Sequence, residues 1–282
     1  MPGTLYLCAT PIGNLGDMTY RGVETLKTVD LIAAEDTRNS IKLLNHFEIK
    51  TPMTSYHEHN KIEKAKFLVE RLLEGKNIAV ITDAGTPGIS DPGEELVRQA
   101  IHAGIQVTAI PGAAAFTTAL IISGLPTRRF VFEAFLPSDK KERREVVKEL
   151  VNETRTIIIY EAPHRLQKTL QELYDVLGNR KISICKELTK RYENVFCTEL
   201  EQAAAFYDSN EPRGEYVMII EGKSRKELEQ ESIEKWDNIS LEEHMNIYLE
   251  KGITKKEAMK CVASDRGIAK RDVYKLLLDG ES

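Results

Sequence analysis

The sequence predicts two consecutive α/β domains followed by a small helical domain. From residue 4 to residue 222, short apolar runs rich in β-branched residues alternate with amphipathic helical patterns. This alternation is typical of sheets built mainly from parallel strands. After residue 223 the strand signals stop, and two basic helical patterns end the chain. We therefore predict an N-terminal α/β domain over 1–113, a second α/β domain over 114–224, and a helical domain with its linker over 225–282.

The predicted elements of the first domain alternate regularly. Strands are expected at 4–10, 30–35, 77–82 and 105–110, and helices at 19–27, 38–47, 61–74 and 92–103. The helix at 61–74 carries Ile62, Leu68 and Leu72 at helical spacing, and Gly75 stands where a helix-ending glycine belongs. The small residues of 111–124 predict a closely packed helix after the last strand.

The second domain repeats the pattern with fewer helices. Strands are expected at 130–135, 156–160, 181–188 and 215–222, and helices at 140–152 and 163–177. Ser138 or Asp139 is expected to cap the first of these helices. Only short segments, 193–197 and 199–206, separate the last two strands. This half is therefore expected to contain a mixed sheet.

The C-terminal region is predicted to be helical throughout. Residues 223–236 are highly charged, which indicates a linker or an exposed helix. Helical patterns at 255–264 and 270–278 flank a turn containing Gly267, a spacing that suits a helix-turn-helix unit. Eight basic residues oppose three acidic ones between 251 and 275. This excess predicts a surface that faces phosphates, and the alternative is a solvated basic face.

Composition excludes several classes of protein. The 282 residues carry a formal net charge of -5, which argues against a uniformly basic coat for nucleic acid. No apolar run is long enough to span a bilayer, and the N-terminus lacks the features of a signal peptide, so a cytoplasmic location is predicted. The four cysteines are scattered, and Cys8, Cys185 and Cys197 lie in strand-like runs where thiols are usually buried. No disulfide framework and no metal site is expected.

The loop DAGTPGISDPG, residues 83–93, follows the predicted strand 77–82, where open α/β sheets bind ligands. Its glycines allow a ligand to approach the backbone, and it matches neither of the glycine-rich phosphate-binding motifs. Asp83 and Asp91 would repel a polyphosphate. A ligand with hydroxyls, an amine and a positive centre fits better, and S-adenosylmethionine has all three. The alternative is a tight connection in which Asp91 caps the helix that begins at Pro92.

Two further loops follow other strands of the same predicted sheet. They are ATPIGNLGD at 9–17 and IPGAAA at 110–115, and both lack Lys and Arg. Three such loops at one sheet edge predict a cleft for a small, flat and largely uncharged group such as adenosine.

Six ordered motifs also carry a family resemblance. They are TPIGNLGD (10–17), AEDTR (34–38), TDAGTPGISDPG (82–93), PGAAA (111–115), YEAPHR (160–165) and RGEYVMIIEG (213–222). Together they resemble the ribosomal RNA small subunit methyltransferase I group of the tetrapyrrole methylase superfamily. The chain departs from the porphyrin-methylating members, which carry GxGPGD and GGDP where it has TPIGNLGD and AGTPG. A tetrapyrrole substrate is therefore disfavoured.

The resemblance implies a homodimer of two-domain subunits with S-adenosylmethionine in the cleft between the α/β domains. It also implies 2′-O-methylation of a cytidine ribose in 16S rRNA of the small ribosomal subunit. By motif position, the residues expected to bind the cofactor are Pro11, Gly13, Asp83, Ala84, Gly85, Thr86, Pro87, Ile89, Ser90, Pro111, Ala114, Ala115, Tyr160, Gly214, Glu215 and Tyr216.

Methyl transfer to a ribose hydroxyl depends mainly on positioning, and a general base adds about 10²–10⁴-fold. The candidates for this base are Glu35, Asp36, His164, Lys186 and Glu187. The structural alternatives are helix capping for the first two, a first-turn helix position for His164, and an edge-strand ion pair for the last two. RNA phosphate contacts are expected from basic residues in or beside the cleft motifs, namely Arg38, Arg128, Arg129, Arg165, Lys190 and Arg191.

Two other functions remain open at this stage. One is methylation of a porphyrin-like small molecule, against which the basic C-terminal helices and the altered glycine loops argue. The other is a non-enzymatic sensor in which the α/β part binds a ligand and the C-terminal helices bind duplex DNA. A gel shift with DNA, together with no methyl transfer to RNA, would support the sensor.

Overall fold

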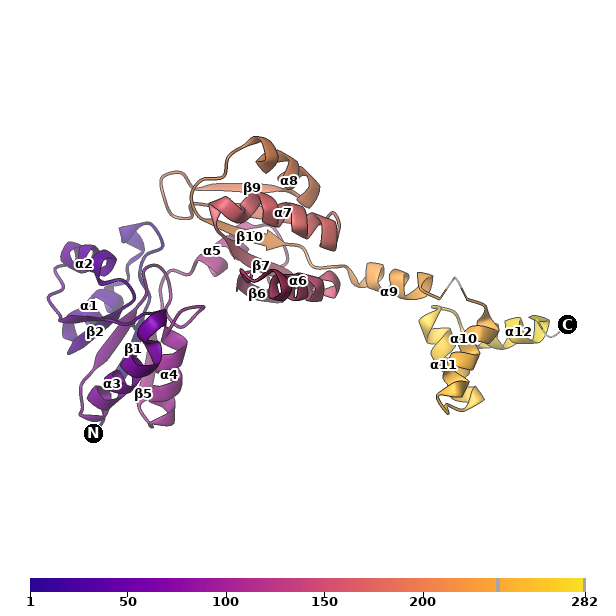
Figure 1. The fold of residues 1–282 in the computed structure, drawn as a ribbon, viewed down its shortest axis with the longest axis horizontal. Helices are drawn as coiled ribbons and strands as arrows, with labels where there is room; N and C mark the ends of the chain where they lie inside the picture. The colour runs from indigo at the N-terminus through magenta and orange to yellow at the C-terminus, as the bar shows by residue number, and fades with distance from the viewer. Residues whose placement is uncertain (237–238, 281–282) are drawn as a thin grey trace. The chain divides into compact units, whose positions relative to one another are not determined.

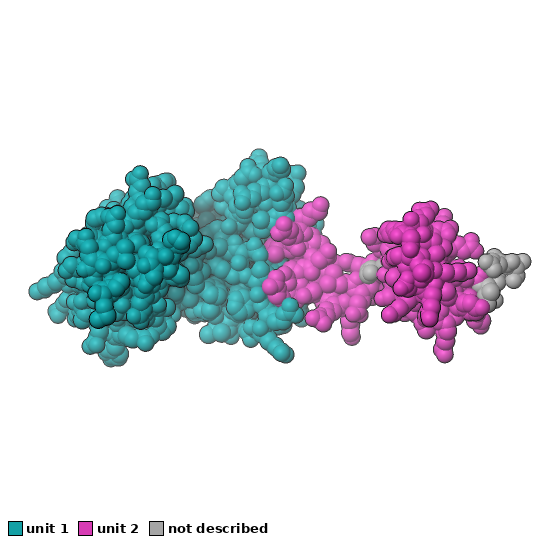
Figure 2. All heavy atoms as spheres, turned by 90° about the horizontal axis from the view of Figure 1, so that it is seen from below, with its two compact units in different colours: residues 1–147, 156–221 teal, residues 148–155, 222–282 magenta. Residues whose placement is uncertain are grey.

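The computed structural model describes residues 1–236 and 239–280. Their contacts divide the chain into two compact units (Figure 2). The first unit comprises residues 1–147 and 156–221, and the second comprises 148–155 and 222–282. The first predicted domain falls within the first unit, and so does the second except for residues 148–155 and 222–224. Their division at residue 113 stays a prediction.

The first sheet has five strands in the order β3-β2-β4-β1-β5, and all neighbouring pairs are parallel. These strands are β1 (Thr4–Cys8), β2 (Leu31–Ala34), β3 (Met53–Ser55), β4 (Ile78–Ile81) and β5 (Gln106–Ile110). The predicted parallel sheet is confirmed. Sequence reasoning missed β3, because its three half-buried residues are too few to show a strand pattern.

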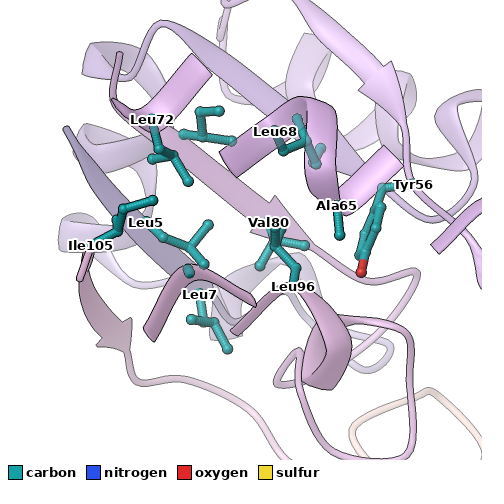
Figure 3. Close-up of a cluster of buried hydrophobic side chains, with 12 residues drawn as sticks. Leu5, Leu7, Tyr56, Ala65, Leu68, Leu72, Val80, Leu96 and Ile105 are labelled. Carbon is teal, nitrogen blue, oxygen red and sulfur yellow. The ribbon is translucent and has the colours of Figure 1, made fainter. Parts of the chain in front are cut away.

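Helices cover both faces of this sheet (Figure 1). They are α1 (Tyr20–Thr28), α2 (Thr37–His46), α3 (Lys61–Leu73) and α4 (Gly93–His102), with short 3-10 helices at η1 (Leu15–Asp17) and η2 (Glu58–Asn60). Leu26 and Leu44 bring α1 and α2 into one core cluster with the sheet. Helices α3 and α4 pack on the opposite face through Leu68 and Leu96 (Figure 3).

A buried tyrosine fixes the start of α4. The Tyr56 hydroxyl lies within the α3–α4 core (Figure 3) and donates a hydrogen bond to the Pro92 carbonyl at 2.7 Å. The glycine-rich loop between β4 and α4 is therefore anchored at its far end to the core of the first sheet.

The second sheet also has five strands, in the order β6-β7-β10-β8-β9. They are β6 (Phe130–Phe135), β7 (Thr156–Glu161), β8 (Lys181–Lys186), β9 (Asn194–Glu199) and β10 (Tyr216–Ile220). Only the β6–β7 pair is parallel, and the other three pairs are antiparallel. The predicted mixed sheet is confirmed.

The helices around the second sheet are α5 (Ala115–Ile122), α6 (Lys140–Glu149), α7 (Pro163–Leu177) and α8 (Leu200–Ser209), with a 3-10 turn at η3 (Leu150–Asn152). Ala119 and Leu120 of α5 pack against β7, β8 and β10. Of the two predicted caps for α6, Asp139 is the right one, because its carboxylate accepts hydrogen bonds from the Lys141 and Glu142 amides, each at 3.0 Å.

The cysteines follow expectation with one exception. Cys8 and Cys185 are buried, and burial raises the pKa of each thiol to about 12. Cys197 is exposed, so the prediction that it is buried was wrong. It lies on β9, which forms an edge of the sheet.

The second unit consists mainly of helices. They are α9 (Arg225–Glu234), α10 (Leu241–Glu250), α11 (Lys255–Asp265) and α12 (Lys270–Gly280). Met245, Val262 and Val273 bring the last three helices around one small core. Of the eight basic residues between 251 and 275, only Arg266 is partly buried, and the others are exposed. In the described part of the chain, no helix is both long and apolar enough to cross a membrane.

A buried histidine organises this small unit. The His244 ring is fully buried and stacks on Trp236, with ring centroids 3.8 Å apart. The Arg266 Nε donates to His244 Nδ1 at 3.2 Å, so this nitrogen must accept. The other ring nitrogen, Nε2, therefore carries the proton and donates to Asp265 at 3.1 Å. Asp265 also accepts from the Tyr248 hydroxyl at 2.5 Å, so the network requires a neutral imidazole.

We expect acid to destabilise this helical unit. Burial lowers the pKa of His244 below its ordinary 6.5, and the neighbouring Arg266 adds to this, although Asp265 acts in the opposite direction. Below about pH 6.5 the unfolded chain binds a proton at His244, whereas the folded unit keeps this histidine neutral. The contribution of His244 to the stability of the unit is therefore complete above about pH 6.5 and is lost as the pH falls toward the folded-state pKa. Trp236, the single tryptophan, reports on this unit in fluorescence-monitored thermal unfolding.

His102 at the end of α4 is exposed and serves as the control histidine. The variant His102→Asn should show the same pH dependence of the unfolding midpoint as the wild type. A fluorescence midpoint that stays constant between pH 7.5 and 5.5 would contradict the assignment of a neutral His244.

Candidate functional site

A well-formed cavity of the first unit lies where the strands of its first sheet end. This cavity, the main cavity, has a volume of about 390 Å³. Ile12 follows β1 and Glu35 follows β2, while seven residues between 82 and 91 follow β4 and residues 114–116 follow β5. The second sheet contributes Phe135 of β6, residues 160–163 at the end of β7, and residues 215–217 at the start of β10. The sequence predicted a cleft at the carboxyl ends of the first sheet's strands, and the main cavity lies there.

The glycine-rich loop is fixed by backbone pairing and by one aspartate. Gly85 adopts a left-handed conformation with φ of 89° and forms an antiparallel bridge with Thr10. The bridge has backbone hydrogen bonds of 2.9 and 3.1 Å, so the loops after β1 and β4 hold one another. Asp91 accepts hydrogen bonds from the Gly88 and Gly93 amides, each with a shortest distance under 3 Å, which closes the loop on itself.

Asp91 thus shapes the loop and also makes the capping contact that the alternative predicted, since it accepts from the Gly93 amide at the start of α4. Pro92 between them already has helical backbone angles. The Asp91 carboxylate makes its hydrogen bonds mainly to amides of the glycine-rich loop. Ser90 beside it has φ of 61°, a strained conformation for a residue other than glycine.

The main cavity is acidic. Among the described residues that line it there are four carboxylates and no Lys, Arg or His. Glu35 is half-buried and accepts a hydrogen bond of 2.5 Å from the Thr82 hydroxyl. Glu215 is exposed, and Glu161 is only 1% exposed. The electrostatic field of these groups favours a ligand with positive charge over a phosphorylated one.

Glu161 is held by a ring of donors. Its carboxylate accepts from the Thr169 hydroxyl at 2.5 Å and from the Ala162 amide at 2.9 Å. Arg165 and Arg143 approach it at 3.3 and 3.8 Å. Arg165 also donates to the Leu136 carbonyl at 2.8 Å. This buried cluster therefore links the end of β7 to Leu136, which follows the cavity residue Phe135.

One wall of the main cavity is aromatic. The Tyr160 hydroxyl accepts a hydrogen bond of 3.0 Å from the Phe116 amide at the start of α5. Its ring lies 5.0 Å from the ring of Phe132 and 5.6 Å from that of Phe135. Burial raises the pKa of Tyr160, so it remains a neutral phenol at physiological pH. An apolar wall with one fixed polar group suits a flat heterocycle.

A second, smaller cavity adjoins the main one. This side pocket has a volume of about 260 Å³ and is lined by Thr10, Pro11, Gly13, Leu15, Asn39, Lys42, Leu43 and Asp83. The Thr10–Gly85 bridge belongs to both cavities, since Thr10 lines the side pocket and Gly85 the main cavity.

Comparison with known proteins identifies the family. Residues 4–204 match the model of the Tetrapyrrole (Corrin/Porphyrin) Methylases. The chain belongs to this family. It is 52% identical to the ribosomal RNA small subunit methyltransferase I of Halalkalibacterium halodurans, over 97% of this chain and 94% of that protein. It is 46% identical to the protein of the same name from Bacillus subtilis, over 96% of this chain and 93% of the relative.

Solved structures support the same fold at low sequence identity. Diphthine synthase is 15% identical with a TM-score of 0.61, over 79% of this chain and 91% of that one. The uroporphyrin-III-C-methyltransferase of Thermus thermophilus is 16% identical with a TM-score of 0.56, over 78% of this chain and 94% of that one. Methylases of this family use S-adenosylmethionine, as the sequence predicted.

In this methylase, ten of the sixteen residues predicted to bind the cofactor line the main cavity. They are Ala84, Gly85, Thr86, Ile89, Ser90, Ala114, Ala115, Tyr160, Glu215 and Tyr216. Pro11, Gly13 and Asp83 line the side pocket instead. Pro87, Pro111 and Gly214 line neither cavity. The role of all sixteen in binding stays a prediction.

Sequence reasoning missed several residues of the main cavity. These are Ile12, Thr82, Phe116, Phe135, Glu161, Ala162, Pro163 and Val217. Three of them, Glu161 to Pro163, belong to the motif YEAPHR, of which only Tyr160 was assigned to the cofactor. The remaining ones are ordinary apolar or small residues, which carry no chemical signal in a single sequence.

The candidate bases of the methylase are placed very differently. Glu35 alone lines the main cavity. Asp36 caps α2 by accepting from the Arg38 amide at 2.8 Å, as its structural alternative predicted. Hydrogen bonds from the Arg38 side chain and amide lower the pKa of Asp36 to about 2. His164 is exposed in the first turn of α7, outside the cavity.

Lys186 and Glu187 also lie outside the main cavity. The Cys185 thiol faces the Ala119 carbonyl of α5 at 3.9 Å, so strand alternation directs Lys186 to the opposite face of the sheet. Glu187 is paired with Lys190 at 3.0 Å, and not with Lys186 as the structural alternative predicted. Burial opposes ionisation of Glu187, but hydrogen bonds from the Glu215 amide and from Lys190 prevail and lower its pKa.

The Glu187–Lys190 pair supports the Glu215 segment. The Glu187 carboxylate accepts from the Glu215 amide at 2.9 Å. Lys190 also contacts the Glu215 carboxylate at 3.0 Å. Gly214 is required here, because it has φ of 89° and a Cβ would lie 2.7 Å from the Glu187 side chain. Glu187 therefore positions one edge of the cavity.

The predicted RNA-contacting residues fall into two groups. Arg165 and Lys190 are ion-paired within the first unit, and Arg38 pairs with Asp36 at 2.9 Å. Arg128, Arg129 and Arg191 are exposed. The second group is therefore better placed to reach a phosphate backbone.

Proposed function

We propose that this chain uses S-adenosylmethionine to methylate the 2′-hydroxyl of a cytidine ribose in 16S rRNA of the small ribosomal subunit. The family, the rRNA methyltransferase relatives and the acidic main cavity support this proposal. The observation that carries it is the lining of the main cavity, whose described residues include four carboxylates and no cation; Glu161 and Glu215 are paired with cations that do not line the cavity.

The cavity fits S-adenosylmethionine better than a phosphorylated nucleotide. Its volume of about 390 Å³ lies in the range of small-molecule sites. The aromatic wall and the small residues at 114–115 suit the adenine, and Glu35 and Glu215 suit the hydroxyls and the ammonium group. When bound, the cofactor supplies a methyl group activated by the positive sulfur. The protein then has to orient the acceptor oxygen and exclude water.

Glu35 is the best-placed candidate for the base. It lies in the main cavity, and its Thr82 partner directs one carboxylate oxygen. A carboxylate held in this way can accept the proton of the ribose hydroxyl while the new bond forms. Asp36, His164, Lys186 and Glu187 are less suitable, since none of them lines the cavity.

RNA is held outside the main cavity in this proposal. Arg128, Arg129 and Arg191 of the first unit and the exposed lysines of α11 and α12 supply positive charge for phosphates. An enzyme with this substrate works in the cytoplasm, where small subunits are assembled. We also propose a homodimer, as in the implied family architecture.

The decisive experiment incubates the purified protein with radiolabelled donor and either naked 16S rRNA or small subunits that lack their modifications. We expect label in a dinucleotide that resists nuclease, which marks a methylated ribose. A parallel calorimetric titration should give heat with S-adenosylmethionine and none with ATP. Tight porphyrin binding, or a DNA gel shift without any methylation of RNA, would instead favour one of the other two functions.

A further inference from the structure

The side pocket differs in chemistry from the main cavity beside it. It contains one cation, Lys42, which is exposed and has no ion-pair partner among the described residues. Arg38 lies one helical turn earlier on α2 and is 89% exposed, but it is paired with Asp36 at 2.9 Å, so Lys42 supplies the unpaired positive charge. The mouth of the side pocket can therefore attract a phosphate, which the acidic main cavity would repel.

Two polar side chains inside the side pocket are held against each other. Asp83 accepts a hydrogen bond from the Asp36 amide at 3.1 Å through Oδ1. Its other oxygen, Oδ2, accepts from the side-chain nitrogen Nδ2 of Asn39 at 3.4 Å. A carboxylate has about four acceptor positions, and an amide has two donors and an acceptor. Both groups keep unused capacity toward a ligand.

The pair of side chains matches the edge of a base with an exocyclic amine. Cytosine offers an amine donor next to a ring nitrogen acceptor, so Asp83 can accept from the amine while Asn39 donates to the ring. Uracil carries a carbonyl oxygen in place of the amine, and this oxygen would face an acceptor-only carboxylate. Leu15 and Leu43 add apolar surface for the plane of the base.

We propose that the side pocket receives the target nucleotide of the RNA and reads its exocyclic amine through Asp83 and Asn39. This inference rests on the proposed function. It reassigns Pro11, Gly13 and Asp83 from the methyl donor to the acceptor. Unstacked bases of single-stranded RNA can enter a protein pocket in this way. The shared Thr10–Gly85 bridge then brings the acceptor ribose next to the donor cavity.

The test compares four variants with the wild type, namely Asp83→Asn, Asn39→Ala, Lys42→Ala and the control Lys66→Ala on the exposed surface of α3. Initial rates are measured with RNA that carries cytidine at the labelled position and with RNA that carries uridine there. Donor affinity is measured separately by calorimetry. Asparagine at position 83 can still accept from the Asp36 amide, so this variant keeps the local fold.

We expect donor affinity to be unchanged in all four variants. Asp83→Asn should reduce the preference for cytidine over uridine about 10-fold, since its amide can donate to the uracil oxygen. Asn39→Ala should raise the KM for RNA about 10-fold. Lys42→Ala should raise that KM for both RNAs and lower the slope of log affinity against log salt by about 0.7, as expected for one lost contact to a single-stranded phosphate.

Loss of donor affinity in Asp83→Asn or Asn39→Ala would show that the side pocket binds the methyl donor, and this would overturn the inference. Unchanged RNA kinetics and an unchanged cytidine preference would overturn it as well, while methylation by the wild type would leave the proposed function standing. A wild type that methylates no RNA would remove the proposed function itself.

Discussion

Gly85→Val is expected to abolish binding of S-adenosylmethionine, with a loss of affinity of about 100-fold or more. A β-branched residue at φ of 89° carries about 1–3 kcal/mol of backbone strain. Relief of this strain would break the bridge to Thr10 that shapes the main cavity. The Cβ itself would make ordinary contact with Ile12 at 3.4 Å, so the backbone strain causes the effect. Calorimetric titration with the donor measures the effect.

Gly104→Val is the matched control for this substitution. Gly104 has φ of 72°, and its added Cβ would meet nothing within 4 Å. It follows α4 and does not line either cavity. This variant should lose stability through comparable backbone strain while donor affinity is preserved. Wild-type affinity in Gly85→Val would refute the placement of the donor in the main cavity.

Glu161→Ala is expected to lower the free energy of unfolding of the first unit by about 3–5 kcal/mol. The substitution leaves Arg143 and Arg165 without the carboxylate that they share, and the Thr169 hydroxyl without its acceptor. Arg143 keeps Glu172 at 2.6 Å and the Thr169 hydroxyl at 2.8 Å, so Glu172 is its one remaining carboxylate among the described residues. Because Arg143 is 8% exposed, water cannot replace the lost partner. Denaturant unfolding followed by circular dichroism measures the change.

The control for Glu161 is Glu211→Ala, which removes the partner of Arg213 in an ion pair of 2.7 Å. Both side chains of that pair are more than 70% exposed, so we expect a change in unfolding free energy below about 0.5 kcal/mol. A Glu161→Ala protein as stable as the control would show that the buried cluster does not support the end of β7.

Much of the fold could be read from the sequence, because its signals are local. The buried runs at β1 and β4, the amphipathic spacing in α3 and the glycine after it are each set by neighbours in the chain. Strand β3 has no such signal, and its pairing with β2 exists only through contacts that are distant in sequence. The roles of Asp36 and Asp91 likewise required knowledge of which amides lie within reach.

The candidate site also contains features that the sequence signals locally and others that depend on tertiary contacts. The glycine-rich loops supplied seven of the ten predicted residues that line the main cavity, since close backbone approach and the lack of cations are local properties of these loops. The other three, Tyr160, Glu215 and Tyr216, were assigned through the family resemblance. Glu161 escaped notice, because its importance comes from Arg143 and Thr169, which reach it from two helices. Arg165 and Lys190 were assigned to RNA because the sequence does not show which side chains pair: Arg165 pairs with Glu161 four residues earlier, and Lys190 contacts both the nearby Glu187 and the distant Glu215.

The sequence by itself determined the class of fold, the family and the acidic, glycine-rich character of the ligand site. These properties follow from residue types and spacings along one segment at a time. Only the tertiary structure decided that Glu35 shares a cavity with Tyr160 and Glu215, and that Pro11, Gly13 and Asp83 line a separate pocket. The reason is physical: the Thr10–Gly85 bridge joins loops that are far apart in the chain, and this backbone pairing forms the wall between the two cavities.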